Sequence, residues 1–446
     1  MPKTVTALAT ALALATSAAA QQQPAAPIPL SFADAVARAA KTAPSVELAG
    51  LRVDEAQARV RVARGSEWPT LSITTGWLNR TFNRHSLGIE FPVAPGSPPF
   101  PDRIGPFDVF DARVQLNQSL FDLAGRARAR AARAAVLGSS AEAHAVAENA
   151  AQTAAIAYLR AVRAAAVFDA RRADSSLAAE LVTLATAQHR AGVSATIDVT
   201  RAEAQLVSTA GALVVARNQM QRTQIDLARA LGLDPATTFQ LTDTLTASVA
   251  AVELPAEREA LVALALQKRP DLAAEAARRE TAERSSAAIK AERLPRLDLA
   301  ADAGVNGPTV ADGIATRQIG VQVTVPLLDG FRREGRLAEQ RAVIKEADVR
   351  GRDLRNQIAA EVNAALLDVG SAVAQQTIAA EGLRLARAEV SQARERFSAG
   401  VAGNIEVITA QVSLVRARDA EIDARFAAAA ARLSLARAAG VVSTMH

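Results

Sequence analysis

Two related stretches of the chain read HRAGVSATIDVTRAEAQL (residues 189–206) and FSAGVAGNIEVITAQVSL (residues 397–414). In both, an Ala-Gly-Val turn follows one helical pattern and comes just before the next. Gly192 and Gly400, the turn glycines, lie 208 residues apart. A period of about half the chain indicates a duplication and not a solenoid of short units.

Other matched positions extend the duplication along the chain. They are Pro44/Pro270, Pro69/Pro295, Asp122/Asp329, Ile197/Ile405, Val199/Val407 and Gly232/Gly440. The spacing falls from 226 for Pro69/Pro295 to 207 for Asp122/Asp329, so the first half carries 19 extra residues in its Pro-rich link, residues 80–107. Each half is predicted to contain a helix, two strands, a very long helix and a returning helix.

The N-terminus has the features of a secretory signal. Lys3 precedes an apolar stretch, and small residues end at Ala20. This pattern predicts a signal peptide over residues 1–20, so the mature chain is expected to leave the cytoplasm. The absence of cysteine excludes disulfides and thiolate metal sites. No later segment approaches the ~20 apolar residues of a membrane helix, so any membrane span is expected to consist of strands.

The charge and composition favour long, closely packed helices. Lys and Arg number 51 against 46 Asp and Glu, for a net charge of +5, and the arginines alternate with Ala and Glu instead of forming a patch. This arrangement indicates solvated helix faces and argues against nucleic acid as a partner. Aromatic residues make up 3% of the chain, so Ala and Leu are expected to provide most of the packing.

Four segments alternate apolar and polar residues with the period of a strand. They lie at about 69–79, 108–121, 296–304 and 317–328. In the first, Leu71, Ile73 and Trp77 share one face. The same alternation fits a half-buried sheet of a soluble protein and a strand that faces lipid, so the pattern alone leaves both open.

Long proline-free runs follow each strand pair. Residues 125–190 would span ~99 Å as one helix. The returning helix, 198–231, covers about half of that length, and the helix at 45–64 supplies the other half. The second half repeats this with residues 330–398, 404–439 and 271–293. The fold class is therefore mainly α with a small β part, and Asp122 and Asp329 are predicted to cap the long helices.

Four strands cannot close into a barrel, because closure takes at least about eight. Either the sheet is open and covered, or several copies of the chain combine. Little apolar sequence is left to cover a sheet, so we expect neighbouring copies to supply the edges. Two copies would give a filled interior and three would give twelve strands around a lumen, which the polar strand faces favour.

These features resemble the TolC-like outer-membrane efflux protein family, or outer membrane factors. The resemblance is carried by the two helix tips, by LARALGL and LARAAGV about 35 residues after them, and by the strand exits QSLFDLAGR (from Gln118) and VPLLDGFRR (from Val325). It implies a homotrimer with a twelve-stranded barrel in outer-membrane lipid and a trimeric α-helical barrel in the periplasm. The implied partners are a periplasmic adaptor and an inner-membrane pump.

The resemblance also divides the chain into segments. They are the signal peptide (1–20), a first efflux repeat (30–232), an equatorial connector (233–256), a second efflux repeat (257–440) and a short tail (441–446). The implied function is a passive exit duct of a tripartite efflux or secretion system. The cargo stays open among drugs, metabolites, metal ions and proteins, as do the class of pump and the role of the Pro-rich link.

The helix tips are the predicted adaptor-docking elements, because they are the exposed turns at the far end of the ~100 Å rods. Gly192 and Val193 lie in the first tip, and Gly400 and Val401 lie in the second. The two glycines are expected to supply the backbone angles that the reversal requires.

Asp198, Glu406 and Thr409 are the predicted aperture residues. Asp198 and Glu406 come just inside the returning helices, where the helix dipole alone favours a carboxylate, so a purely structural role also stays open. The resemblance assigns Glu406 to the first of two acidic ring positions and Thr409 to the second, which is usually acidic. Ala402 stands where the family has an arginine. A ring of Glu406 side chains is expected to give a cation preference.

No catalytic, phosphate-binding or metal-ligand motif stands out, and the four histidines are scattered. The chain is therefore predicted to be no enzyme and to use no cofactor or metal. Two alternatives to a channel stay open: an exported Ala-rich coiled-coil scaffold without a pore, and a periplasmic adaptor. An adaptor is expected to have one helical hairpin between β-rich domains, whereas this chain has two hairpins, each after a strand pair.

Overall fold

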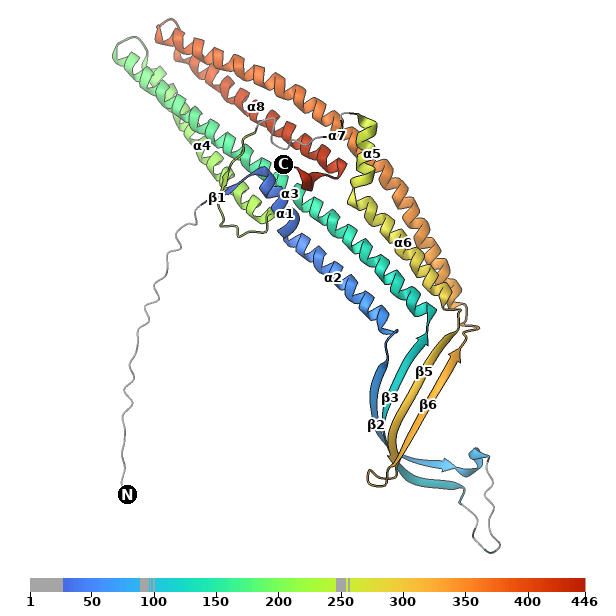
Figure 1. Cartoon of the computed structure of the whole chain (residues 1–446). Helices are drawn as coiled ribbons and strands as arrows, with labels where there is room; N and C mark the ends of the chain where they lie inside the picture. Colours follow the sequence, from blue (N-terminus) through green and yellow to red (C-terminus); the bar gives the residue numbers. More distant parts are fainter. Residues whose placement is uncertain are drawn as a thin grey trace, which may run out of the picture.

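The structure is a computed structural model, and it describes residues 27–88, 96, 98, 101–245, 254–255 and 257–445. The predicted signal peptide, the centre of the Pro-rich link and residues 246–253 of the connector lie outside the described residues. Figure 1 shows an elongated molecule, with two helical hairpins at one end and a small sheet at the other. The predicted fold class, mainly α with a small β part, is confirmed.

Two very long helices run from the sheet to the tips. They are α3 (Leu123–Arg190) and α7 (Arg332–Ser398). Helix α4 (Thr196–Ala230) returns along α3, and α8 (Asn404–Ala439) returns along α7. In the half nearer the sheet, α2 (Pro44–Gly65) packs on α3, and α6 (Pro270–Ala291) contacts both α3 and α7 (Figure 1). Two shorter helices thus accompany each long one, as the proline-free runs predict.

Both long helices end in the same backbone motif. Gly192 has a φ of 77° and Gly400 a φ of 71°. The Gly192 N–H donates to the His189 carbonyl at 3.0 Å, and the Val193 N–H donates to the Gln188 carbonyl at 2.9 Å. This pair of bonds is a Schellman motif, which satisfies the last carbonyls of the helix and needs a left-handed residue. Only glycine adopts that conformation without a steric penalty, so the two tip glycines fix the reversals.

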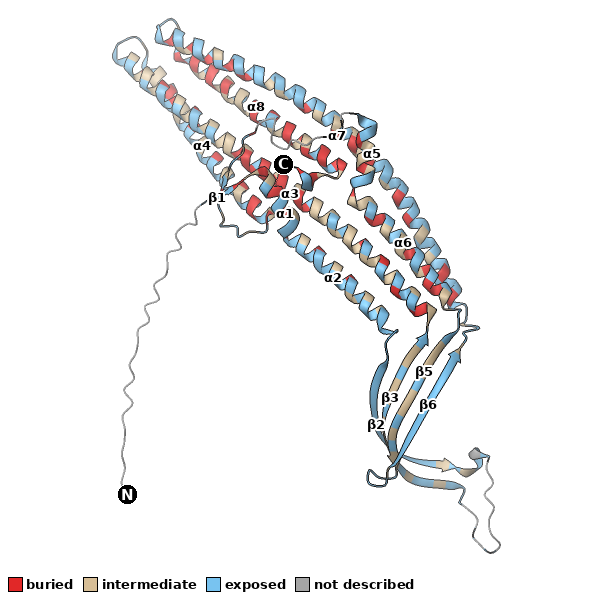
Figure 2. Cartoon of the chain, in the orientation of Figure 1, coloured by how far each residue is buried: buried red, intermediate tan, exposed pale blue. Residues whose placement is uncertain are grey.

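Alanine provides most of the packing between helices. The majority of the buried residues of α3 are alanines, including Ala151, Ala154 and Ala155, which are fully buried. Figure 2 shows the buried residues concentrated on the helices, whereas the sheet is largely exposed. Small side chains let helices approach closely, which explains how a chain so poor in aromatic residues forms a core.

The largest core cluster lies midway along the rods. There β1 (Ile28–Leu30) pairs in parallel with β4 (Phe239–Leu241), next to α1 (Phe32–Thr42). The fully buried Tyr158 hydroxyl lies 2.7 Å from the Asp243 carboxylate and 3.0 Å from the Leu30 carbonyl. Helix α5 (Arg258–Lys268) and the 3₁₀ turn Val442–Thr444 complete this equatorial region. The tyrosine thereby joins the connector to α3.

The sheet has four antiparallel strands in the order β2-β3-β5-β6. They are β2 (Thr70–Asn83), β3 (Arg103–Phe121), β5 (Arg296–Gly307) and β6 (Ile314–Thr324). The hairpin of one repeat therefore lies beside the hairpin of the other, and β2 and β6 form the two edges.

The register aligns an apolar face across all four strands. Ile73, Val114 and Ala303 lie side by side in a row that ends at Arg317 on β6, and in the next row of this face Ala301 is paired with Ile319. Ile73 is 79% exposed and Ile319 is 75% exposed, so no part of the chain that the structure describes covers this face.

The opposite face of the sheet is polar. It holds Arg113, whose guanidinium bonds Asp111 at 2.8 Å and Asp302 at 2.6 Å. The sheet therefore separates an uncovered apolar face from a face with paired charges.

The strand limits differ from the predicted ones by three residues or more at five ends, and in the second hairpin β5 continues to Gly307 and β6 begins at Ile314. β2 continues to Asn83 and β3 begins at Arg103, so both reach further into the Pro-rich link than expected. β6 ends at Thr324 instead of 328, because Pro326 has no N–H to donate to the sheet.

The predicted helix cap at Asp122 needs correction, whereas the Asp329 carboxylate does accept a backbone N–H from the first turn of α7. Asp122 occupies the N-cap position of α3, but its carboxylate accepts a hydrogen bond from Arg128 at 3.0 Å and caps no backbone N–H. Asp329 lies before the cap residue of α7, which is Phe331, and it accepts from the backbone and side chain of Arg333. Arginine side chains near the helix starts compete with the backbone N–H groups for both carboxylates. Among the described residues, no helix is both long and apolar enough to cross a lipid bilayer.

We predict that Gly192→Ala loosens the first tip. The left-handed conformation costs an alanine about 1–2 kcal/mol, although there is open space around the position. Hydrogen–deuterium exchange of residues 186–200 should accelerate by about tenfold. Gly211→Ala, which also has open space but lies within α4, is the matched control and should slow exchange or leave it unchanged. Equal exchange in wild type and Gly192→Ala would contradict this account of the turn.

Candidate functional site at the helical tips

The tips of the two hairpins contact each other through hydrogen bonds. The Gln188 side-chain amide donates to the Phe397 carbonyl at 2.9 Å, and the Asn404 amide donates to the Asp198 carbonyl at 2.5 Å. A Cβ added to Gly400 would lie 3.5 Å from a methyl group of Val193. The sequence predicts both tips but not that these polar contacts join them.

Glu406 forms an ion pair across its own turn. Its carboxylate lies 3.1 Å from the Arg396 guanidinium, and both side chains are about half exposed. Because such exposed pairs contribute about 0–1 kcal/mol, the pair can open at little cost. It lines a hollow of about 450 Å³ between α7 and α8, together with Thr409, Gln392 and Glu389.

Thr409 lines the same hollow as Glu406, whereas Asp198 does not. Asp198 is in the first turn of α4, and its carboxylate approaches Arg201 at 3.8 Å. Thr409 borders the same hollow as Glu406, but its hydroxyl donates to the Ile405 carbonyl of its own helix at 2.8 Å. The structure thus places Glu406 and Thr409 together and gives Asp198 a local partner.

The two valines of the tips are free of contacts that would bury them. Val193 is 63% exposed and Val401 is 71% exposed. Each follows its turn glycine directly, so each tip presents an apolar side chain on a rigid turn at the end of a long rod.

Arg396 is the functional candidate that sequence reasoning missed. It lies ten residues before Glu406, on the other side of the turn, so helical spacing does not connect them. The predicted turn could have indicated this contact, because an antiparallel hairpin brings together residues at equal distances from its tip.

A buried charge cluster joins the hairpins further from the tips. Asp174 of α3 pairs with Arg418 of α8 and with Arg171, and Arg171 also bonds Asp419 at 2.6 Å. Burial raises the pKa of the Asp174 carboxyl, and Arg418 and Arg171 oppose this shift. Removal of Asp174 would leave Arg418 without this partner in a largely buried position, so this cluster holds α3 and α8 in place.

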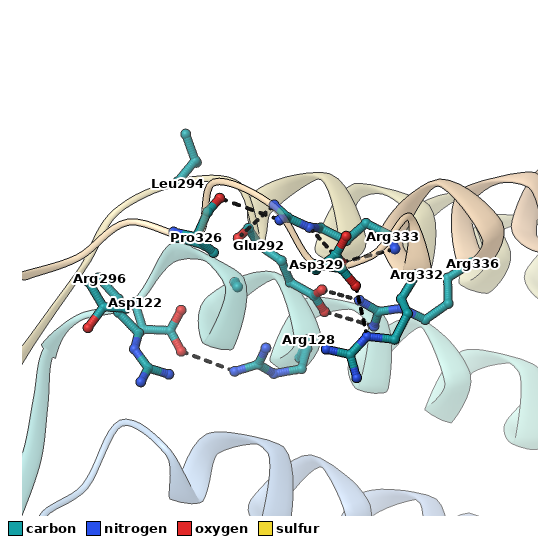
Figure 3. A pocket seen from close by; sticks show the side chains of 12 residues that line it. Asp122, Arg128, Glu292, Leu294, Arg296, Pro326, Asp329, Arg332, Arg333 and Arg336 are labelled. Carbon is teal, nitrogen blue, oxygen red and sulfur yellow. Dashed lines mark hydrogen bonds and ion pairs between the residues drawn. The ribbon is translucent and has the colours of Figure 1, made fainter.

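A second hollow, of about 850 Å³, lies where the strands meet the helices (Figure 3). Asp122 and Asp329, matched positions of the two repeats, both line it. Arginines surround them, and Arg336 forms a bidentate pair with Glu292. We call this the junction hollow. Among the described residues, no group of His, Asp or Glu side chains is arranged to hold a metal ion.

Comparison with known proteins agrees with this architecture. The family model described as "outer membrane efflux protein" matches residues 35–233 and 261–441. Protein CyaE of Bordetella pertussis is 26% identical over 400 residues, which cover 88% of this chain and 80% of CyaE. Outer membrane efflux protein BepC of Brucella suis is 24% identical, over 73% of this chain and 71% of BepC.

The fold is shared with a solved structure as well. The outer membrane protein VceC of Vibrio cholerae superposes with a TM-score of 0.73 at 21% identity, over 92% of this chain and 96% of VceC. The family model covers both repeats and the structural likeness extends over nearly the whole chain. The chain therefore belongs to the outer membrane efflux protein family, as an outer-membrane protein with an export role whose long helices lie on the periplasmic side.

Proposed function

We propose that three copies of the chain form a channel that passively conducts cargo from the periplasm to the outside. The open four-stranded sheet is the observation that carries this proposal. Its outer strands, β2 and β6, each have one unpaired edge in the single chain. Unpaired backbone groups are costly inside a membrane, so neighbouring copies have to pair with both edges. Three copies supply twelve strands and leave room for a lumen.

The two faces of the sheet support the same arrangement. The apolar face with Ile73 and Ile319 suits lipid, and the polar face with Arg113 and Asp302 suits a water-filled lumen. A soluble scaffold would leave the apolar face in water, which argues against the alternative without a pore.

Exposed apolar side chains on the outer helices provide a second contact between copies. Val207, Val214 and Val215 are exposed on α4, at one edge of the helical layer. Leu367, Ile378 and Leu385 are exposed on α7, at the other edge. Contact between α4 of one copy and α7 of the next would bury both sets and continue the wall as a helical tunnel.

We further propose that the tips form the periplasmic entrance. Glu406 gives this entrance its charge, and Arg396 partly neutralises it. The cation preference expected from a ring of Glu406 side chains then depends on the fraction of these ion pairs that is formed. The exposed Val193 and Val401 are the proposed contacts of a periplasmic adaptor, through which an inner-membrane pump delivers cargo. No step of this function requires catalysis.

The test of the function is conductance of the purified full-length chain in planar lipid bilayers, where we expect stable single channels. Glu406→Gln should shift the reversal potential in a KCl gradient toward anions, and Arg396→Gln should shift it toward cations. With salt screening, permeability ratios should change by about twofold to tenfold. An inert scaffold would give no channels. Equal ion selectivity in the wild type, Glu406→Gln and Arg396→Gln would contradict the proposed place of Glu406 at the entrance.

A crosslinking experiment tests adaptor docking. A photoreactive residue at position 193 or 401 should crosslink to a periplasmic adaptor produced in the same cells. The control position is Thr309, in the loop between β5 and β6 at the opposite end of the molecule. Crosslinks from position 309 alone would contradict docking at the tips.

A further inference from the structure

The junction hollow is rich in arginine. Its described lining residues include five arginines and three carboxylates, an excess of two positive charges. The arginines are Arg128, Arg296, Arg332, Arg333 and Arg336. Each carboxylate already has an arginine partner: Arg128 bonds Asp122, Arg333 bonds Asp329, and Arg336 bonds Glu292.

Arg332 has no such acidic partner among the described residues. Its guanidinium donates to the Asp329 backbone carbonyl at 3.0 Å and forms no ion pair there, although its charge also acts on the Asp329 carboxyl, which Arg333 already binds. The side chain is exposed at the rim of the hollow, beside Arg336 (Figure 3). A guanidinium with free N–H groups is well suited to bind a carboxylate or phosphate through two parallel hydrogen bonds.

The duplication shows that this charge is a feature of the second repeat alone. With the spacing of 207 residues, Gly125 is the counterpart of Arg332, and Arg126 is the counterpart of Arg333. Arg126 lies over the Phe121 ring at 5.9 Å, whereas Arg333 is buried and bonds the Pro326 and Glu292 carbonyls. The first repeat therefore contributes a carboxylate and Arg128, and the second repeat adds most of the positive charge.

The strand register shows on which side the hollow opens. Arg296 of β5 is paired with Thr324 of β6, and both line the hollow. Their neighbours Leu297 and Val323 are paired on the other face of the sheet, which is the apolar one. The hollow therefore opens on the polar face. The proposed function assigns that face to the lumen.

We propose that the junction hollow is a binding subsite for the carboxylate or phosphate group of an anionic cargo, as it passes from the helical tunnel into the barrel. This inference rests on the proposed function, because it requires the polar face to line a conducting lumen. Helices α3 and α7 both begin beside the hollow, so their N-terminal N–H groups add to the positive potential. With three copies, three such subsites would surround the exit of the tunnel.

The chemistry favours an oxyanion over a purely structural network. Three carboxylates satisfy three of the arginines within the chain, and Arg296 pairs with Asp298 at 3.0 Å outside the hollow. Arg332 is thus the group that a bound oxyanion would engage first. A lipid phosphate carries the same chemistry, but it would have to reach the polar face of the sheet.

The experiment measures block of single channels by inorganic phosphate and by citrate, with the full-length protein in neutral phosphatidylcholine bilayers. We expect both anions to reduce the current, and Arg332→Gln to raise the half-blocking concentration by about tenfold, as expected for loss of one charge-assisted contact. Arg332→Lys should restore part of the effect. Arg258→Gln, which removes the same charge from the exposed start of α5, is the control and should behave as wild type.

The outcomes separate this inference from the proposed function. A protein that forms no channels would contradict both the anion subsite and the proposed channel function. Channels that neither anion blocks, or that are blocked equally in wild type and Arg332→Gln, would overturn the subsite and leave the duct intact. An Arg332 effect that appears only in bilayers with phosphatidylglycerol would assign the site to a lipid headgroup and overturn the cargo subsite. Because Arg332 is exposed and lacks an acidic partner, Arg332→Gln is expected to fold normally.

Discussion

The rest of the structure depends on a sheet that one chain cannot complete. Four strands present two unpaired edges and an uncovered apolar face, and no other element of the described chain lies over them. Backbone N–H and C=O groups at such edges need partners, and inside lipid only other strands can provide them. The same reasoning applies to the helices, because α4 and α7 carry exposed apolar residues at the two margins of the helical layer. One constraint therefore accounts for the shape of both parts.

The two ends of the helical layer differ in charge. At the tips, Glu406 and Arg396 form an exposed ion pair, so a modest change in their contact alters the charge at the proposed entrance. At the sheet, arginines outnumber carboxylates in the junction hollow. The ion cluster of Asp174, Arg171 and Arg418 holds the hairpins together between these ends. In the proposed channel, a cargo would meet the partly neutralised carboxylates of the tips first and the basic junction hollow later.

The sequence predicts most of the fold, because its signals are local. Proline-free runs predict the long helices, and alternation predicts the strands and their apolar faces. The turn glycines predict the reversals, and the structure shows them in Schellman motifs. Local sequence patterns predict the strand ends less accurately. Pro326 ends β6 earlier than expected, and β2 continues to Asn83.

The sites depend on contacts that local patterns do not contain. Asp122 and Asp329 lie 207 residues apart, and they meet in one hollow because α6 packs between α3 and α7. The predicted capping role is wrong for Asp122, whose carboxylate bonds Arg128, whereas the Asp329 carboxylate accepts both the backbone N–H and the guanidinium of Arg333. The contact between Arg396 and Glu406 is not predicted by helical spacing, because the turn between α7 and α8 brings the two side chains together. Whether the tip residues act as entrance and docking site stays a prediction.

The central claim is that identical copies share the wall of one passage. The most direct measurement is the mass of the purified protein in detergent, with the detergent contribution subtracted, by native mass spectrometry or light scattering. If three copies share the wall, the particle has three times the mass of one mature chain and is stable on dilution. A protein that stays monomeric would contradict the account, and so would a stable dimer, whose eight strands would leave no open lumen.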